Sequence, residues 1–230
     1  LSQHAQQARH WQLTSLFAQD GQRFRHFSVE AAGLFLDFSK NHIDADTLAL
    51  LSAFARARQL EQRRDAMFNG ELINATEHRP ALHILLRAPT EQRFVLDGEV
   101  LSNDVQQVLD RMETLVEKIR NGEWRGYSGK PITDVVNIGI GGSDLGPAMA
   151  CAALRPFAMP GLRTHYLSNV DGHATDAVLA TLSPETTLFI VASKSFTTQE
   201  TLINACVARD WFLGTGKESD LALHFVAVST

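Results

Sequence analysis

The chemically richest segment of the chain is residues 193–198, which carries four hydroxyl groups and one ammonium group in six positions. The apolar run at residues 187–192 precedes it and predicts a buried strand. A helical repeat of apolar residues follows over 199–212. The polar groups thus lie where a strand ends and a helix begins, and helix N-termini attract negative charge. We expect an anion here, and a phosphate fits best.

Helix capping is the alternative use of these hydroxyls. Thr197 and Glu200 have the spacing of a capping box, in which each side chain bonds the other residue's backbone. A capping box needs one hydroxyl, whereas this segment offers four and Lys194. We therefore expect an anion site in addition to any cap.

A second turn of interest is the glycine-rich segment at residues 139–146. Its glycine pattern resembles the dinucleotide-binding fingerprint, but Asp144 occupies the place of the third glycine. A carboxylate in the first helical turn stabilises the helix dipole and repels a pyrophosphate. The simpler alternative, a tight turn whose glycines serve backbone geometry alone, leaves Ser143 without a role.

Both turns are expected to face one ligand. They follow the first and third predicted strands, which are neighbours in a sheet of flavodoxin-like order, and ligands bind beyond the carboxyl ends of such strands. The charge of Asp144 then directs the anionic end of the ligand towards Lys194 and its neutral hydroxyls towards Gly142 and Ser143. A small phosphorylated polyol matches this division.

The elements that hold these turns predict an α/β unit. Strands are expected at residues 135–140, 163–168, 187–192 and 221–228, with helices between them, which gives a parallel sheet. Residues 1–125 predict a mostly helical region, with helices over 1–20, from Asp44 or Asp46 to 67, and from a Ser102 cap to 121, and a strand at 34–38. We expect two domains, 1–125 and 126–230. The second would lack its C-terminal end, as in the N-terminal piece of a longer protein.

Composition narrows the class of protein. The apolar fraction is 44%, the net charge is −5, and no long basic run occurs, which argues against a nucleic-acid partner. No apolar stretch reaches membrane-spanning length. Cys151 and Cys206 fall in predicted helices and fit buried thiols of a reducing compartment. We expect a soluble cytoplasmic protein without a membrane partner.

Three sequence blocks resemble the phosphoglucose isomerase family. They are GELINATEHR at 70–79 with Leu82 and His83, NIGIGGSDLGP at 137–147, and 168–201, which ends in PETTLFIVASKSFTTQET. The resemblance implies a sugar-isomerase (SIS) domain with a five-stranded parallel sheet. It also implies aldose–ketose isomerisation between glucose 6-phosphate and fructose 6-phosphate through a cis-enediol, in glycolysis and gluconeogenesis. It further implies a homodimer without metal or nucleotide cofactor.

The resemblance also implies roles for individual residues. Ser195 stands where the family more often has threonine, which keeps the hydroxyl, and His78 and Pro80 replace commoner small residues. The resemblance implies three groups of substrate-binding residues. The phosphate loop comprises Ser193, Lys194, Ser195 and Thr198. Gly142 and Ser143 belong to the turn that contacts the sugar, and Thr201 lies beside the phosphate.

No catalytic residue is expected within the chain. The family's general-base glutamate, its ring-opening histidine and lysine, and its enediolate-stabilising arginine lie further along, so the chain alone should be inactive. Glu200 is expected to cap a helix, and His83, His165 and His224 to be structural, while His173 could approach the crevice. The alternative function is a non-catalytic sugar-phosphate-binding regulatory domain, which downstream sequence would distinguish.

Overall fold

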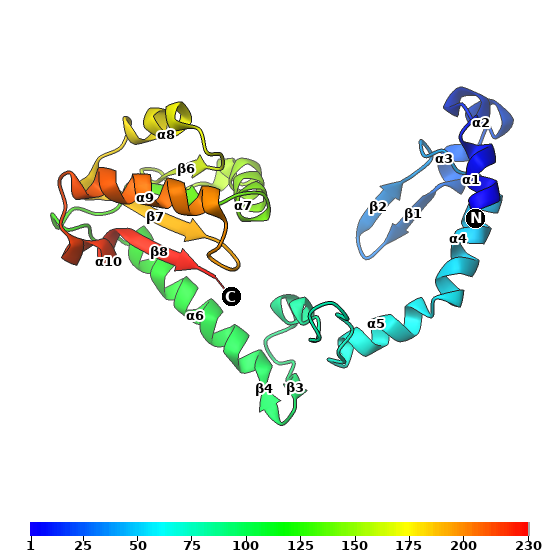
Figure 1. Cartoon of the computed structure of the whole chain (residues 1–230), viewed down its shortest axis with the longest axis horizontal. Coiled ribbons are helices and arrows are strands. Elements are labelled where there is room, and N and C mark those ends of the chain that lie inside the picture. Colours follow the sequence, from blue (N-terminus) through cyan, green and yellow to red (C-terminus); the bar gives the residue numbers. More distant parts are fainter. Residues whose placement is uncertain (230) are drawn as a thin grey trace. The chain divides into compact units, whose positions relative to one another are not determined.

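The computed structural model describes residues 1–229 and divides into two compact units, Leu1–Asn103 and a second that begins at Asp104. Each is described by itself (Figure 1). Helix α6, Leu101–Arg120, begins with the last residues of the first unit and belongs mostly to the second. The expected domain boundary at residue 125 stays a prediction.

The second unit is built on a four-stranded parallel sheet in the order β6-β5-β7-β8. Its strands are β5 (Asp134–Ile138), β6 (Arg163–Leu167), β7 (Thr187–Ala192) and β8 (Phe225–Val228). Its main helices are α7 (Gly142–Ala153), α8 (Gly172–Leu179) and α9 (Gln199–Leu213), with short helices η2 (Arg155–Phe157), η3 (Pro184–Thr186), η4 (Glu218–Asp220) and α10 (Leu221–His224). The predicted α/β class is confirmed, as is the adjacency of the first and third strands.

The two central strands form the core. Val136, Ile138 and Phe189 are fully buried, as expected for strands covered on both faces. Helix α9 packs along β5 and β7 and touches α8, and Figure 1 shows it crossing the sheet. Phe225 of β8 stacks on Phe189 with ring centroids 4.8 Å apart, so the edge strand is held by aromatic packing as well as by backbone pairing.

The fourth strand is shorter than expected. It begins at Phe225, while Leu221–His224 forms the short helix α10. The prediction of a strand from residue 221 was wrong because a short apolar run does not distinguish strand from helix. His224 consequently lies at the end of a helix rather than in a strand, whereas His165 lies in β6 as expected.

The first unit consists of short helices and two hairpins. Its elements are α1 (Ser2–Ala8), α2 (Leu13–Gln19), α3 (Arg23–His26), β1 (Ser28–Ala31), β2 (Leu34–Asp37), α4 (Ala45–Ala57), α5 (Leu60–Phe68), η1 (His83–Arg87), β3 (Val95–Leu96) and β4 (Glu99–Val100). The expected strand at 34–38 is confirmed and pairs with β1, which the sequence did not reveal.

The single helix expected over residues 1–20 is instead two helices. The break lies between Ala8 and Leu13. His4 makes an edge contact with Trp11, and its Nε2 lies 2.6 Å from Thr47 Oγ1. These contacts fold α1 back over Trp11 and towards the start of α4, and a straight helix would break them.

The predicted helix ends at Asp44 and Gly70 are confirmed, and the predicted cap at Ser102 is not. Asp44 caps α4, since its Oδ1 accepts a 2.7 Å hydrogen bond from the Thr47 amide. Gly70, at φ +77°, follows the end of α5 as expected. The Ser102 cap was wrong: this residue lies inside α6, and its Oγ accepts a hydrogen bond from the amide of Phe94.

Neither a membrane span nor a metal cluster is found in residues 1–229. No helix there is long and apolar enough to cross a bilayer. No group of three or more His, Cys, Asp or Glu side chains there could hold a metal ion.

His224 ties three parts of the second unit together. Its ring is fully buried, Nδ1–H donates to Thr187 O at 2.7 Å, and Nε2 accepts from the Tyr127 amide at 2.9 Å. A Cβ at position 126 would lie 2.6 Å from the ring, so glycine is required there. Burial lowers the pKa of His224, and the hydrogen bond to Thr187 offsets this only in part. Protonation would also remove the acceptor that the Tyr127 amide uses.

The folded pKa of His224 lies below its unfolded value, so its contribution to stability should be complete above about pH 6.5 and decline as pH falls below that. Urea unfolding at pH 7 and pH 5 measures this loss. His224→Gln should be less stable at pH 7 by about 1–3 kcal/mol, because two buried partners lose their bonds. It should also lose part of the pH dependence. The exposed His173→Gln serves as control and should keep the full dependence.

Candidate functional site

The two turns singled out from the sequence leave the same edge of the sheet. Strands β5 and β7 pair in parallel, with Ile138 opposite Val191, so their carboxyl ends coincide. The β5–α7 turn at residues 139–141 and the β7–α9 turn at residues 193–198 therefore start side by side. This is the crevice at which a doubly wound sheet binds its ligand.

The β5–α7 turn is tight and held in place. Asn137 Nδ2 donates to Ser143 O at 2.9 Å, which joins the strand to the first turn of α7. A Cβ on Gly139 would lie 2.6 Å from Ser143 O, and Gly141 has φ +58°. These two glycines are explained by backbone geometry. Gly142, by contrast, has nothing within 4 Å of the position of an added Cβ, which leaves open space at the helix start.

The β7–α9 turn is anchored at its start and in its middle. The Ser193 amide donates to Val228 O at 3.0 Å, and Ser229 Oγ donates to Lys194 O at 3.0 Å. Phe196, at φ +52°, packs its ring on the core of the sheet. Ser195 Oγ lies 2.6 Å from Thr197 Oγ1. The backbone is therefore fixed, while Lys194, Ser195 and Thr197 are exposed and Ser193 is buried.

Helix α9 begins without a side-chain cap. Its N-cap residue is Thr198, so Glu200 is the second helical residue and not the third. The predicted capping box is therefore wrong, because the helix starts one residue later than the box requires and Thr197 bonds Ser195 instead. Within residues 1–229, the N-cap side chain makes no hydrogen bond to the first amide groups of this helix, and such amides can bind an anion.

Within the described residues 1–229, three buried polar atoms beside these turns lack a hydrogen-bond partner: Ser193 Oγ, Thr201 Oγ1 and Asp144 Oδ1. Ser193 is 4% exposed, Thr201 is 1% exposed and Asp144 is 8% exposed. Burying a polar atom without a partner costs free energy, so such atoms are rare and call for a partner that the chain itself does not supply. Their location marks this edge as the candidate ligand site.

The buried face of α9 changes character along its length. Thr201 and Asn204 are polar and lie near the turn, whereas Ala208 and Phe212 are apolar and lie further along the sheet. Asn204 Nδ2 donates to Asn169 O at 3.0 Å, which fastens the loop after β6 to the same helix. Sequence reasoning missed Asn137 and Asn204. Their signals were an amide within an apolar strand and an amide one turn after Thr201.

The structure places all seven predicted substrate-binding residues at the two turns and the helix starts that follow them. Gly142 and Ser143 begin α7, the β7–α9 turn carries Ser193, Lys194, Ser195 and Thr198, and Thr201 lies in the first turn of α9. Whether each contacts a ligand stays a prediction.

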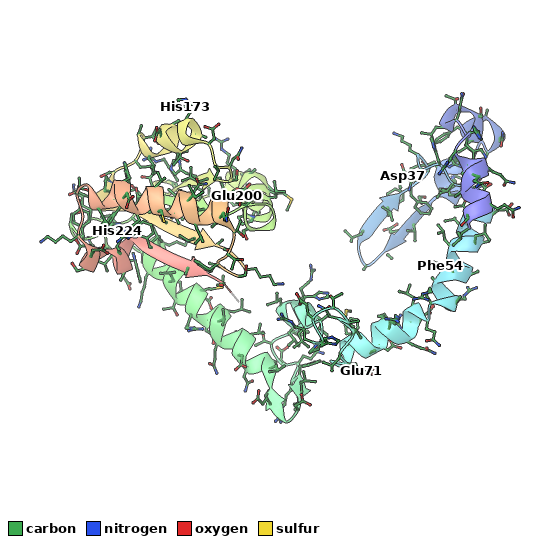
Figure 2. The ribbon with its side chains drawn as sticks, in the orientation of Figure 1. Asp37, Phe54, Glu71, His173, Glu200 and His224 are labelled. Atoms are coloured by element: carbon green, nitrogen blue, oxygen red, sulfur yellow. The ribbon has the colours of Figure 1, made fainter. Side chains whose placement is uncertain are left out.

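The other candidates lie elsewhere. His83 belongs to the first unit, and His173 is exposed on α8, as Figure 2 shows. Both cysteines, expected to be buried, are exposed on their helices.

A charged cluster occupies the opposite edge of the sheet. Asp134 is 1% exposed, and its Oδ1 lies 2.8 Å from both Arg163 Nε and His165 Nε2. Burial alone would raise the pKa of Asp134, but hydrogen bonds from Arg163, His165 and Thr133 outweigh it and lower the pKa. Since the cluster lies at the amino ends of β5 and β6, it stabilises the sheet rather than the crevice.

Comparison with known proteins assigns the family. Residues 37–230 match the family model described as phosphoglucose isomerase. The chain belongs to this family. It is 51% identical over 230 residues to glucose-6-phosphate isomerase 2 of Chromobacterium violaceum and 50% identical over 231 residues to glucose-6-phosphate isomerase of Shewanella baltica. Each alignment covers 100% of this chain and 42% of the relative, so the chain spans less than half the length of these relatives.

A solved structure supports the assignment. The crystal structure of a glucose-6-phosphate isomerase from Chlamydia trachomatis aligns with a TM-score of 0.76 at 26% identity. The alignment covers 98% of this chain and 43% of that chain. The phosphoglucose isomerase fold is thus present over the length of the chain.

Two threonines provide a matched test of the unpartnered hydroxyl. Both are buried, but Thr187 Oγ1 donates to Ser183 O at 2.7 Å whereas Thr201 Oγ1 has no partner. Thr187→Val should lower the free energy of unfolding by about 0.5–1.5 kcal/mol. Thr201→Val should leave it unchanged or raise it, because no hydrogen bond is lost. Urea unfolding followed by tryptophan fluorescence measures both, and equal destabilisation would contradict the assignment.

Proposed function

We propose that this chain is the phosphate-binding part of a glucose-6-phosphate isomerase, which interconverts glucose 6-phosphate and fructose 6-phosphate through a cis-enediol. Membership of the phosphoglucose isomerase family supports the reaction class. The observation that carries the site is the set of buried hydroxyls, Ser193 Oγ and Thr201 Oγ1, that lack a partner beside an uncapped helix start.

In this proposal the β7–α9 turn binds the phosphate. Ser193, Ser195 and Thr198 offer hydroxyl donors, Lys194 offers positive charge, and the first amides of α9 point towards the same anion. Hydrogen bonds to a charged group contribute about 1.5–3 kcal/mol each. Several of them suffice for micromolar binding after the cost of immobilising the ligand.

The hydroxylated end of the sugar would lie at the start of α7. Gly142 leaves room for the ligand to approach the backbone, and Ser143 offers a hydroxyl. Thr201 would complete the phosphate side from within α9.

Proton transfer between C1 and C2 needs a base whose pKa is near the working pH and positive charge beside the developing oxyanion. We propose that these groups belong to sequence beyond residue 230, so that this chain binds substrate without turning it over.

The cellular setting follows from the same proposal. The full-length enzyme would act in glycolysis and gluconeogenesis as a cytoplasmic homodimer, with no metal or nucleotide cofactor. Two free thiols support a reducing compartment. The net charge of −5 supports a site that does not bind nucleic acid.

Calorimetric titration with 6-phosphogluconate tests the phosphate assignment. The chain should bind this ligand, and Lys194→Ala should weaken binding by at least about tenfold, since a charge-assisted contact is removed. Lys118→Ala, on helix α6, is the matched control and should bind like the unsubstituted chain. Unchanged binding by Lys194→Ala would contradict the role of Lys194.

An isomerase assay tests whether this chain binds the substrate without converting it. The 230-residue chain should show no conversion of fructose 6-phosphate in a coupled assay, whereas the full-length protein should be active and should lose activity on Lys194→Ala. Turnover by the short chain would contradict the proposal. A full-length protein that binds the sugar phosphate without converting it would instead be a regulatory sugar-phosphate-binding domain.

A further inference from the structure

Asp144 places a buried negative charge at the start of α7. It lies in the first turn of the helix, is 8% exposed, and its Oδ1 has no hydrogen-bond partner. The amides at a helix start normally attract an anion. Here a carboxylate already supplies that charge, so a second anion would meet repulsion as well as attraction.

The surrounding structure keeps this carboxylate in place. The bond from Asn137 Nδ2 to Ser143 O holds the first turn of α7 against β5, and Gly139 has no room for a side chain. The pKa of Tyr166 on β6 is raised, first by burial, then by a hydrogen bond with Cys151, with a smaller contribution from the charge of Asp144.

The two helix starts at this edge of the sheet differ in charge. The β7–α9 turn combines Lys194 with four hydroxyls, and the carboxylate in the first turn of α9, Glu200, is exposed to solvent. At α7 the carboxylate is buried, where screening by water and salt is weaker. The start of α9 thus favours an anion, whereas the start of α7 disfavours one.

We propose that Asp144 is a specificity-determining residue that restricts the site to ligands with one phosphate. The phosphate lies at residues 193–198, and the other end of the ligand must be a neutral polyol to lie at Gly142 and Ser143. A sugar bisphosphate would bring its second phosphate against Asp144. This inference rests on the proposed function, because it takes the β7–α9 turn as the phosphate site.

Two ligands that differ only in the second phosphate test the inference: glucitol 6-phosphate and glucitol 1,6-bisphosphate, neither of which can be isomerised. In calorimetric titration the 230-residue chain should bind the monophosphate more tightly by about tenfold, or about 1.4 kcal/mol. Asp144→Asn keeps the side-chain shape and removes the charge. It should reduce this preference to about threefold or less, because repulsion of the second phosphate is lost.

Glu200→Gln is the matched control, since it removes an exposed carboxylate from the first turn of the other helix. It should change the affinities for both ligands alike and leave their ratio unchanged. Asp144→Ser provides a second variant without the charge, and circular dichroism checks that each variant folds. The ratio in the unsubstituted chain is a test that needs no variant.

The outcomes separate the two proposals. Equal affinity of the unsubstituted chain for both ligands, or an unchanged ratio in the folded Asp144 variants, overturns the role of Asp144 alone. If the chain does not bind the monophosphate, the proposed function fails together with this inference.

Discussion

The pairing of β5 with β7 is the constraint on which the candidate site depends. Parallel pairing brings two carboxyl ends to one edge, although β6, the helices α7 and α8 and the short helices η2 and η3 lie between the two strands in sequence. The right-handed crossovers that connect parallel strands make this arrangement available. Without this register, the glycine-rich turn and the hydroxyl-rich turn would be unrelated loops. With it, they face a common space.

The same edge is where the unit leaves polar groups unsatisfied. Elsewhere in the second unit, two buried polar side chains do have partners: Asp134 is bonded by Arg163 and His165, and His224 bonds two backbone groups. At the crevice, Ser193 Oγ and Thr201 Oγ1 are buried without one. Binding sites often carry such a cost in stability, because groups arranged for a ligand cannot also satisfy one another.

Much of the second unit could be predicted from sequence, because its strands are continuous apolar runs and its turns carry glycine and hydroxyl clusters. The positions of β5, β6 and β7, the parallel pairing and the meeting of the two turns followed from these local patterns. The predictions failed where tertiary contacts decide between similar local structures. Residues 221–224 form a helix, and the N-cap residue of α9 is Thr198 rather than Thr197.

The first unit was harder to predict, because its elements are short and depend on contacts distant in sequence. The division of the first predicted helix depends on the contact of His4 with Thr47, and strand β1 depends on pairing with β2. Within the site, sequence patterns located the turns but not the amides that fasten them. The side chains of Asn137 and Asn204 donate hydrogen bonds to backbone carbonyl oxygens. Every residue has such an oxygen, so the sequence does not reveal which one accepts the bond.

The attachment of the β7–α9 turn to the end of β8 sets a minimum length for a working fragment. The Ser193 amide bonds Val228 O, and Ser229 Oγ bonds Lys194 O. A shorter chain that ended after α9 would retain every residue assigned to the phosphate, yet it would lose both of these hydrogen bonds. The smallest fragment that keeps the turn in place must therefore include β8 and Ser229. The residues proposed to contact the ligand are not sufficient to define it.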